Sequence, residues 1–478
     1  MPRAAPITVA AAVALAAVTA AGLVRAAGGA ADGAPVEPAL KRVLFWPSRT
    51  AGGAGNGGGG DPPRCLDGSP AGYYIDAPPD GKPVPTKWIV WLEGGGICQS
   101  AADCRERAKS DLGSSVNWPA ELAPDANRGL LSADPMRNPD FAQGWRHVFV
   151  PYCSGDAWVG DATEALSPFD DALGGEGADG DAFVGYFQGR TILMRTLEVL
   201  GLVGVGPDAG SGAGAALTPA VSEFVLTGCS AGGIGTFLNA DAVSERIVAA
   251  FPSARVVARP EAGWFGLPLL TYDAFTHGAP DPDMHHMGTS EWTKKIATWP
   301  WQTTAYAQCV ADRRHHLRPK DNCTDHEACC TFTPYLYPYI STPMFVSQSV
   351  ADSYQIFTQG GAPLEDSEPV HKYVEYLRAT LHESLERVVV HGNGLRLPSA
   401  RAWRGAPAHK LAADGRAGGG GNGIFGVACM GHCLPWRSNA STVRGYDDAG
   451  AFGAWYRGAL AGGAAMLLDD TTKLAPTC

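Results

Sequence analysis

Three features are scarce in this 478-residue sequence: charged residues, clusters of basic residues, and long apolar stretches beyond the N-terminus. Only 18% of the residues are charged, and no run of Lys and Arg interrupts the formal net charge of -11. A negative surface repels phosphate backbones, so nucleic acid is not an expected partner. No segment after the N-terminal region is long and apolar enough to span a bilayer. The sequence has no internal repeat.

Apolar side chains, in contrast, are plentiful enough to bury a large core. Hydrophobic residues make up 45% of the chain and aromatic residues 9%, which argues against disorder and simple fibres. Glycine (61 residues) and proline (36 residues) are above average usage, and they concentrate locally. Three small-residue stretches are interpreted as loop insertions: Ala172–Asp181, Val203–Ala220 and Arg404–Gly423.

The N-terminus has the pattern of a secretory signal peptide. A short positive start at Arg3 precedes the apolar run Ile7–Val24, and small residues follow, so residues 1–27 are predicted to be a signal peptide. An uncleaved membrane anchor is the competing interpretation, because the run approaches the roughly 18 residues that span a bilayer. Residues 28–63 are expected to form a flexible, low-complexity lead, with ordered structure starting near Arg64. Residues 64–478 are expected to form one domain of a secreted protein, monomeric and without a membrane span once the signal is removed.

Twelve cysteines agree with export, because an oxidising compartment converts many thiols into bridges. An even number permits full pairing, but the connectivity stays open. One cluster has the ligand density of a zinc site, although its spacing matches no standard zinc pattern; its members are Cys309, Cys323, His326, Cys329 and Cys330. Disulfides are the preferred interpretation, so no metal is expected. Sequons at Asn322 and Asn439 are compatible with glycosylation.

Short β-branched and aromatic runs alternate with longer helical segments along the chain. The predicted strands are Lys87–Leu92, His147–Tyr152, Glu223–Thr227, Arg255–Ala258 and Met344–Ser349. The predicted helices are Gly185–Leu200, Gly232–Ala250 and Val370–Val389. This alternation predicts an α/β fold with a mostly parallel central sheet flanked by helices, stapled by disulfides and carrying long Gly-rich loop insertions.

The strongest local signal for chemistry is the segment Gly228-Cys229-Ser230-Ala231-Gly232. It follows an apolar strand and opens a helix, which is the context required of a G-x-S-x-G nucleophile elbow. Ser230 is therefore the candidate nucleophile, and the N–H of Ala231 can donate to a developing oxyanion. The structural alternative is a serine that only caps the helix. Packing or a disulfide suits Cys229 better than a catalytic role.

A glycine block after the first strong strand supplies a candidate for the second oxyanion donor. Leu92-Glu93-Gly94-Gly95-Gly96 exposes backbone N–H groups with no side chain in the way. Three glycines also make an ordinary flexible turn. Only the position of this block upstream of the elbow favours a role as oxyanion donor.

An activated serine needs a histidine base and a carboxylate that orients it, and in α/β-hydrolases they follow in the order Ser, acid, His. Asp352 lies just past a predicted strand and is the best acid. The alternative acids are Asp325, Glu365 and Asp366. The late histidines in loop surroundings are His391, His409 and His432, whereas His371 and His382 fall in a predicted helix. His432 lies between two cysteines that could pin its loop against the sheet.

Several blocks together resemble the pectin acetylesterase family, which includes the Notum carboxylesterases. They are Cys65–Pro70, Leu92–Gly96, Tyr152–Asp156, Gly228–Gly233, Ala351–Ser353 and Gly431–Cys433, in the order the family has them. The resemblance implies a secreted α/β-hydrolase-like serine esterase without metal or cofactor. It implies a triad of Ser230, Asp352 and His432, and oxyanion donors at Gly95, Gly96 and Ala231.

Two departures from the family affect the expected substrate. Ile97 stands where pectin acetylesterases usually carry Trp, and Glu261-Ala262-Gly263-Trp264 replaces the family's Asp-Ala-Gly. Ile97 and Trp264 are accordingly the candidate substrate-binding residues. The family name implies an O-acetylated cell-wall polysaccharide, and an anionic one would need a local basic groove. The alternatives are a Notum-like deacylase of a lipid-modified protein, a catalytically idle carbohydrate-binding or interaction protein, and transacylation to another alcohol.

Overall fold

The protein is described by a computed structural model that covers residues 39–45, 61–77, 84–123, 126–168, 183–203, 220–265, 271–277, 304–315, 326–386, 388, 422–439, 441–458, 466–469 and 478. The predicted signal peptide lies outside these residues. Of the three predicted loop insertions, only Val203, Ala220, Asn422 and Gly423 lie within them.

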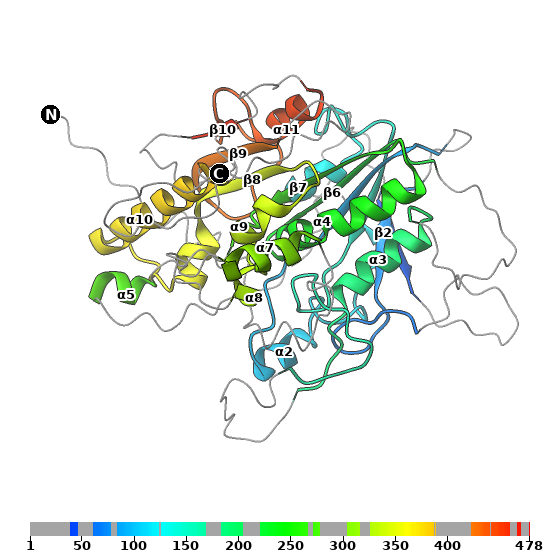
Figure 1. The fold of residues 1–478 in the computed structure, drawn as a ribbon, viewed down its shortest axis with the longest axis horizontal. Helices are drawn as coiled ribbons and strands as arrows, with labels where there is room; N and C mark the ends of the chain where they lie inside the picture. The colour runs from blue at the N-terminus through cyan, green and yellow to red at the C-terminus, as the bar shows by residue number, and fades with distance from the viewer. Residues whose placement is uncertain are drawn as a thin grey trace, which may run out of the picture.

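The described strands form a single sheet (Figure 1). They are β1 (Leu40–Leu44), β2 (Gly72–Ile75), β3 (Lys87–Leu92), β4 (Glu121–Leu122), β5 (Trp145–Val150), β6 (Glu223–Cys229), β7 (Arg255–Glu261), β8 (Phe345–Asp352), β9 (Gly423–Gly431) and β10 (Met466–Leu468). Their order across the sheet is β10-β9-β8-β7-β6-β3-β5-β2-β1-β4. The run from β10 to β5 is parallel, whereas β2, β1 and β4 add an antiparallel edge.

Helices flank this sheet, as expected from the alternating pattern. The α-helices in the described residues are α2 (Ala101–Arg107), α3 (Gly189–Val199), α4 (Ala231–Ala250), α5 (Tyr272–His277), α7 (Thr304–His315), α8 (His326–Cys329), α9 (Thr333–Leu336), α10 (Glu368–Leu385) and α11 (Asp448–Tyr456). Helix α4 packs on β6 and β7, while α10 and α11 pack on β8 and β9 (Figure 1). The predicted α/β-hydrolase-like fold with a mostly parallel sheet is therefore confirmed.

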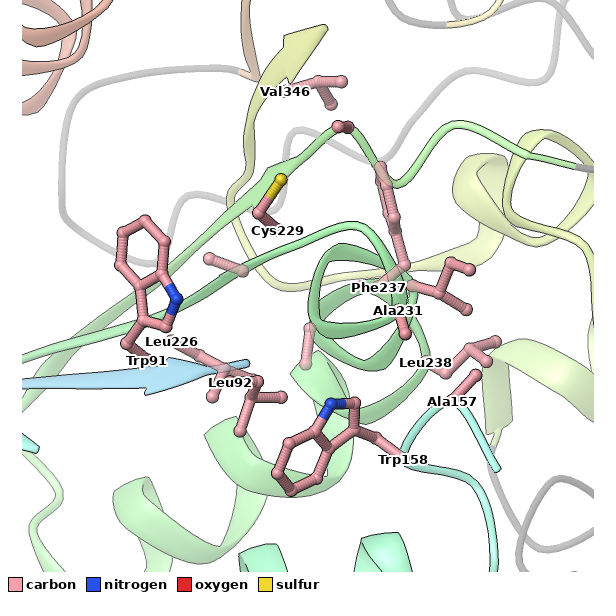
Figure 2. Close-up of a cluster of buried hydrophobic side chains, with 14 of the residues drawn as sticks. Trp91, Leu92, Ala157, Trp158, Leu226, Cys229, Ala231, Phe237, Leu238 and Val346 are labelled. Carbon is pink, nitrogen blue, oxygen red and sulfur yellow. The ribbon is translucent and has the colours of Figure 1, made fainter. Parts of the chain in front are cut away.

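The parallel strands lie in the core because both of their faces are covered. Strand β8 is buried along its whole length, and β6 and β7 are buried from their second residue onward. Trp158 packs against helix α4 (Figure 2). The approach is so close that a Cβ on Gly235 would lie 2.5 Å from the Cβ of Trp158. Continuous burial of this kind explains the uninterrupted apolar runs in the sequence.

One expectation about the start of the ordered domain is wrong. The segment 28–63 was expected to be a flexible lead, yet residues 40–44 within it form β1, which pairs antiparallel with β2 and β4. Backbone hydrogen bonds to two neighbouring strands hold β1, and Leu40 is buried. The strand has only five residues and contains Lys41 and Arg42, so its alternation of apolar and polar residues is too weak to predict a strand within a Gly-rich segment.

Disulfides staple the fold at five places among the described residues: Cys65–Cys153, Cys98–Cys104, Cys229–Cys433, Cys309–Cys330 and Cys429–Cys478. Two members of the zinc-like cluster are thus bonded to each other, and the described part of the chain holds no group of side chains suited to a metal ion. Within the same residues, no helix reaches the length and hydrophobicity needed to cross a membrane.

Candidate active site

Five neighbouring parallel strands direct their carboxyl ends to the same edge of the sheet. In the order β9-β8-β7-β6-β3, these ends lead into His432, Asp352, Glu261, Ser230 and the glycine block that starts at Gly94. In an open α/β sheet the crevice outside the carboxyl ends is where ligands bind. The topology therefore gathers candidate residues that are separated by as many as 338 positions, the difference between 432 and 94, at one edge.

Ser230 occupies a sharp turn between β6 and α4. Its backbone has φ 60° and ψ -123°, a conformation that costs a non-glycine residue on the order of 1–3 kcal/mol. The turn is tight because the helix start presses on the neighbouring strand: a Cβ at Gly232 would lie 2.0 Å from the carbonyl oxygen of Leu92. The N–H of Ser230 donates to the carbonyl oxygen of Glu261 at 3.0 Å. A strained serine between a strand and a helix is the geometry of a nucleophile elbow.

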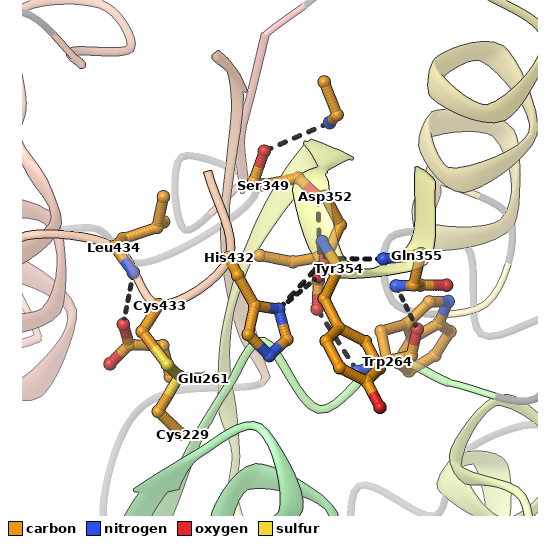
Figure 3. Close-up of polar contacts among 12 residues, drawn as sticks. Cys229, Glu261, Trp264, Ser349, Asp352, Tyr354, Gln355, His432, Cys433 and Leu434 are labelled. Atoms are coloured by element: carbon orange, nitrogen blue, oxygen red, sulfur yellow. Dashed lines mark hydrogen bonds and ion pairs between the residues drawn. A yellow bond between two sulfur atoms is a disulfide. The ribbon is translucent and has the colours of Figure 1, made fainter. Parts of the chain in front are cut away.

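Asp352 and His432 are in direct contact. Nδ1 of the imidazole lies 2.9 Å from each carboxylate oxygen of Asp352 (Figure 3). The carboxylate is fully buried and accepts three more hydrogen bonds, from the side chain of Gln348 and from the N–H groups of Tyr354 and Gln355. Because the carboxylate accepts at Nδ1, the ring proton is held there and the lone pair is on Nε2.

The other imidazole nitrogen remains available. Among the described residues, His432 Nε2 is buried and has no hydrogen-bond partner. No hydrogen bond joins it to the Ser230 hydroxyl in this part of the chain, and catalytic hydrogen bonds of this kind often tighten only when substrate is bound. The two residues are nevertheless held near each other. The disulfide Cys229–Cys433 joins the residue before Ser230 to the residue after His432, with Cα atoms 5.9 Å apart.

The glycine block lies against the elbow. A Cβ at Gly94 would be 2.8 Å from the Cβ of Ser230, so the backbone passes directly beside the serine. Gly95 and Gly96 have φ values of +154° and +74°, which only glycine adopts readily. The carbonyl oxygen of Gly95 accepts a hydrogen bond of 2.6 Å from the guanidinium of Arg107. This contact fixes the orientation of the peptide between the two glycines.

Of the alternatives considered for the acid and the base, those in the described residues lie elsewhere. Asp366 pairs with His371 at 2.7 Å, and both side chains are solvent-exposed. Glu365 is likewise exposed, and His382 on α10 faces Glu386, the residue after the end of this helix. Asp325, His391 and His409 lie outside the described residues.

The two candidate substrate-binding residues have different surroundings. Ile97 follows Gly96 and is mostly buried, with 7% of its surface exposed. Trp264 is fully buried: its ring packs on Phe237 and Tyr337, and its Nε1 donates to the hydroxyl of Ser384 at 3.0 Å. With no exposed surface, the Trp264 side chain has a packing role in this structure, and its contact with substrate stays a prediction.

The backbone of Trp264 supports the acid from behind instead. Its N–H donates to Gln348 Oε1, and its carbonyl oxygen accepts from Gln355 Nε2 (Figure 3). Both glutamines contact Asp352. The following residue, Phe265, reaches the site, because its ring packs edge-on against His432 at 5.9 Å between centroids.

Tyr354 is a site residue that the sequence did not suggest. Its ring stacks on the imidazole of His432 at a centroid distance of 5.2 Å, and its hydroxyl lies 3.7 Å from where a Cβ of Gly96 would be. Burial raises the pKa of Tyr354, which keeps its hydroxyl protonated. The one signal available was its position two residues after Asp352, at the end of a strand.

Proteins of the family that the residue blocks resemble are similar to this chain in sequence. Residues 61–205 match the pectinacetylesterase family. The chain is 29% identical over 338 residues to palmitoleoyl-protein carboxylesterase NOTUM of Drosophila melanogaster, covering 68% of this chain and 41% of that protein. The human enzyme of that name is 28% identical, with 68% and 56% covered. Pectin acetylesterase 11 of Arabidopsis thaliana is 26% identical, with 61% and 60% covered.

The resemblance to the pectin acetylesterase family is confirmed. The chain spans 41% to 57% of the length of the first Notum relatives that it matches, and these relatives are carboxylesterases by name. A crystal structure of the Wnt deacylase Notum from Drosophila superposes with a TM-score of 0.57, covering 92% of this chain and 97% of that one. At 23% sequence identity, this likeness bears on the fold alone.

Proposed function

We propose that this chain is a serine carboxylesterase in which Ser230 is the nucleophile, His432 the general base and Asp352 the residue that orients the base. The observation that carries this proposal is the state of His432. One ring nitrogen is bound to a buried carboxylate, while the other is unpartnered among the described residues and lies on a loop joined covalently beside Ser230. This is the arrangement that serine hydrolases use.

The reaction follows from this arrangement. Ser230 Oγ attacks the ester carbonyl and its proton passes to His432 Nε2, which then gives it to the departing alcohol. The N–H groups of Gly95, Gly96 and Ala231 donate to the oxyanion of the tetrahedral intermediate, and losing one such donor typically costs about 10²–10³ in rate. Water, activated by the same imidazole, then releases the acid from the acyl-serine. No step needs a metal or a cofactor.

The substrate we propose is an O-acetyl group on a cell-wall polysaccharide. Support comes from relatives named pectin acetylesterases and from the side chains around the base. The rings of Tyr354 and Phe265 both pack on His432, and the Tyr354 hydroxyl extends toward Gly96. An acyl chain that leaves Ser230 toward this side meets bulky rings and a polar hydroxyl, which suits acetyl better than a long chain.

A second candidate is a deacylase of a lipid-modified protein, because the first relatives are named palmitoleoyl-protein carboxylesterases.

We also propose that the protein is secreted, with residues 1–27 as its signal peptide. Structural disulfides form and persist in oxidising compartments, and five bridges in the described residues fit such a location.

The test compares the wild type with Ser230→Ala on acetylated pectin, acetylated xylan and p-nitrophenyl esters from acetate to palmitate. Ser367→Ala, at the start of α10, is the matched control for a lost hydroxyl. We expect acetate release by the wild type and the control, no release by Ser230→Ala, and a kcat/KM that falls beyond butyrate. Turnover by Ser230→Ala would contradict the mechanism, and a preference for palmitate would favour the second candidate.

A further inference from the structure

Glu261, the last residue of β7, contacts the backbone of two segments at once. Its carbonyl oxygen accepts the N–H of Ser230 at 3.0 Å. Its side-chain Oε1 accepts the N–H of Leu434, two residues after His432, at 2.6 Å (Figure 3). A single residue therefore bonds to the elbow that carries the nucleophile and to the loop that carries the base.

A buried charge cluster holds the Glu261 carboxylate in place. Oε2 lies 3.0 Å from Nη1 of Arg259, which also pairs with Asp448 of α11. Asp448 in turn accepts the hydroxyl of Ser347 at 2.9 Å. All of these side chains are almost completely buried, so each loses water and depends on its partners. Burial, opposed by Arg259 and reinforced by Asp448, raises the pKa of Glu261 to about 7.

The same cluster reaches the His432 loop by a second route. The guanidinium of Arg259 lies 5.0 Å from the ring centre of Trp436, two residues beyond Leu434. On the other side, α4 presses directly on β7, since a Cβ at Gly233 would lie 2.1 Å from the carbonyl oxygen of Glu261. The end of β7 is thus packed between the elbow and the loop, with little room to shift.

We propose that Glu261 is a positioning residue for ester hydrolysis: its two hydrogen bonds set the separation between the Ser230 hydroxyl and the His432 imidazole. This inference depends on the proposed function of the same site. The length of the side chain is the critical property. Removing one methylene from the side chain shortens its reach by about 1.5 Å. An Asp that keeps the contact with Arg259 then loses the N–H of Leu434.

The first test is Glu261→Asp, with Glu261→Gln as its complement. A misplacement of roughly 1 Å in an active site can cost about 10²-fold in rate. We therefore expect Glu261→Asp to lower kcat on p-nitrophenyl acetate by roughly 10- to 100-fold, with KM within about twofold. Inactivation by a fluorophosphonate, which reports the reactivity of Ser230 without ester binding, should slow equally. Glu261→Gln keeps the length of the side chain, so its kcat should fall less than that of Glu261→Asp.

The matched control is Glu375→Asp, which removes the same methylene from a half-exposed carboxylate that lies 3.0 Å from Arg378 on α10. It should keep the wild-type kcat. Hydrogen exchange of the Leu434 amide supplies a readout without any activity, and it should accelerate in Glu261→Asp alone. Wild-type kcat in Glu261→Asp, an equal loss in Glu375→Asp, a larger loss in Glu261→Gln, or unchanged exchange of the Leu434 amide would each overturn the inference. Ester hydrolysis by Ser230→Ala would instead contradict the proposed function. Hydrogen exchange of the Leu434 amide would still test the contact between Glu261 and Leu434.

Discussion

Replacing Asp352 by Asn tests how the base is oriented. The carboxylate accepts four hydrogen bonds, from His432 Nδ1, Gln348 Nε2 and the N–H groups of Tyr354 and Gln355. An amide of the same shape offers only one acceptor oxygen. If that oxygen stays on the two N–H groups, the new NH₂ faces His432, which can pair with it only by moving its own proton to Nε2. That nitrogen then cannot accept the proton of Ser230.

The expected loss is large because the wrong tautomer removes the base entirely. The same substitution in the serine-protease triad lowers kcat by about 10⁴, which corresponds to roughly 5.4 kcal/mol at 1.36 kcal/mol per decade. We expect a loss of about 10³–10⁴ in kcat on p-nitrophenyl acetate, with KM nearly unchanged. Folding is checked by the thermal midpoint and by retention of the Cys229–Cys433 bridge.

Asp366→Asn is the matched control, since Asp366 contacts His371 at 2.7 Å on the protein surface. The same chemical change at a second Asp–His pair should leave kcat within about twofold, because exposed pairs contribute little. If folded Asp352→Asn kept kcat within tenfold of the wild type, the role of Asp352 in fixing the tautomer would be wrong.

Three further predictions concern stability. Replacing both Cys229 and Cys433 by Ala should lower the free energy of unfolding by about 2–5 kcal/mol, because their bridge closes a separation of 204 residues. Urea unfolding measures this loss, and an unchanged unfolding midpoint would refute the prediction. Trp264→Phe should lower that free energy by about 1–3 kcal/mol while KM for acetyl esters stays constant. A change in KM without a change in stability would instead indicate that Trp264 contacts the substrate. Burial raises the pKa of Glu261 above the ordinary range of a glutamate, so protonation of this side chain favours the native state. The unfolding free energy should therefore fall as pH rises from about 4.5 to 7, by at most about 1.4 kcal/mol per pH unit, and Glu261→Gln should flatten this slope.

Local sequence signals predicted the elbow well, because its strand, turn and helix are contiguous. Lys87–Leu92 is a strand with the predicted limits, and α4 begins one residue before its predicted start. Strand β9 was missed, since Gly423, Gly426 and Gly431 dilute its apolar pattern and a Gly-rich stretch precedes it. The position of His432 beside Asp352 therefore came only from the family resemblance and the flanking cysteines.

Contacts that depend on distant packing could not be predicted. Trp264 is buried because Ser384 on α10 supplies a partner for its indole N–H, 120 positions away. The stacking of Tyr354 on His432 likewise requires β8 and β9 to be paired first. No pattern within a short window carries this information, because the partners belong to different elements.

The bridge between Cys229 and Cys433 has a consequence for biosynthesis. At roughly 5–20 residues per second, Cys229 leaves the ribosome about 10–40 s before Cys433 does. Throughout that interval its thiol is open to mispairing with earlier cysteines, and Cys429 becomes accessible just before the correct partner does. Maturation of the site therefore depends on thiol–disulfide exchange that can reverse an early wrong bond, so yields of active protein should depend on the redox buffer used for expression.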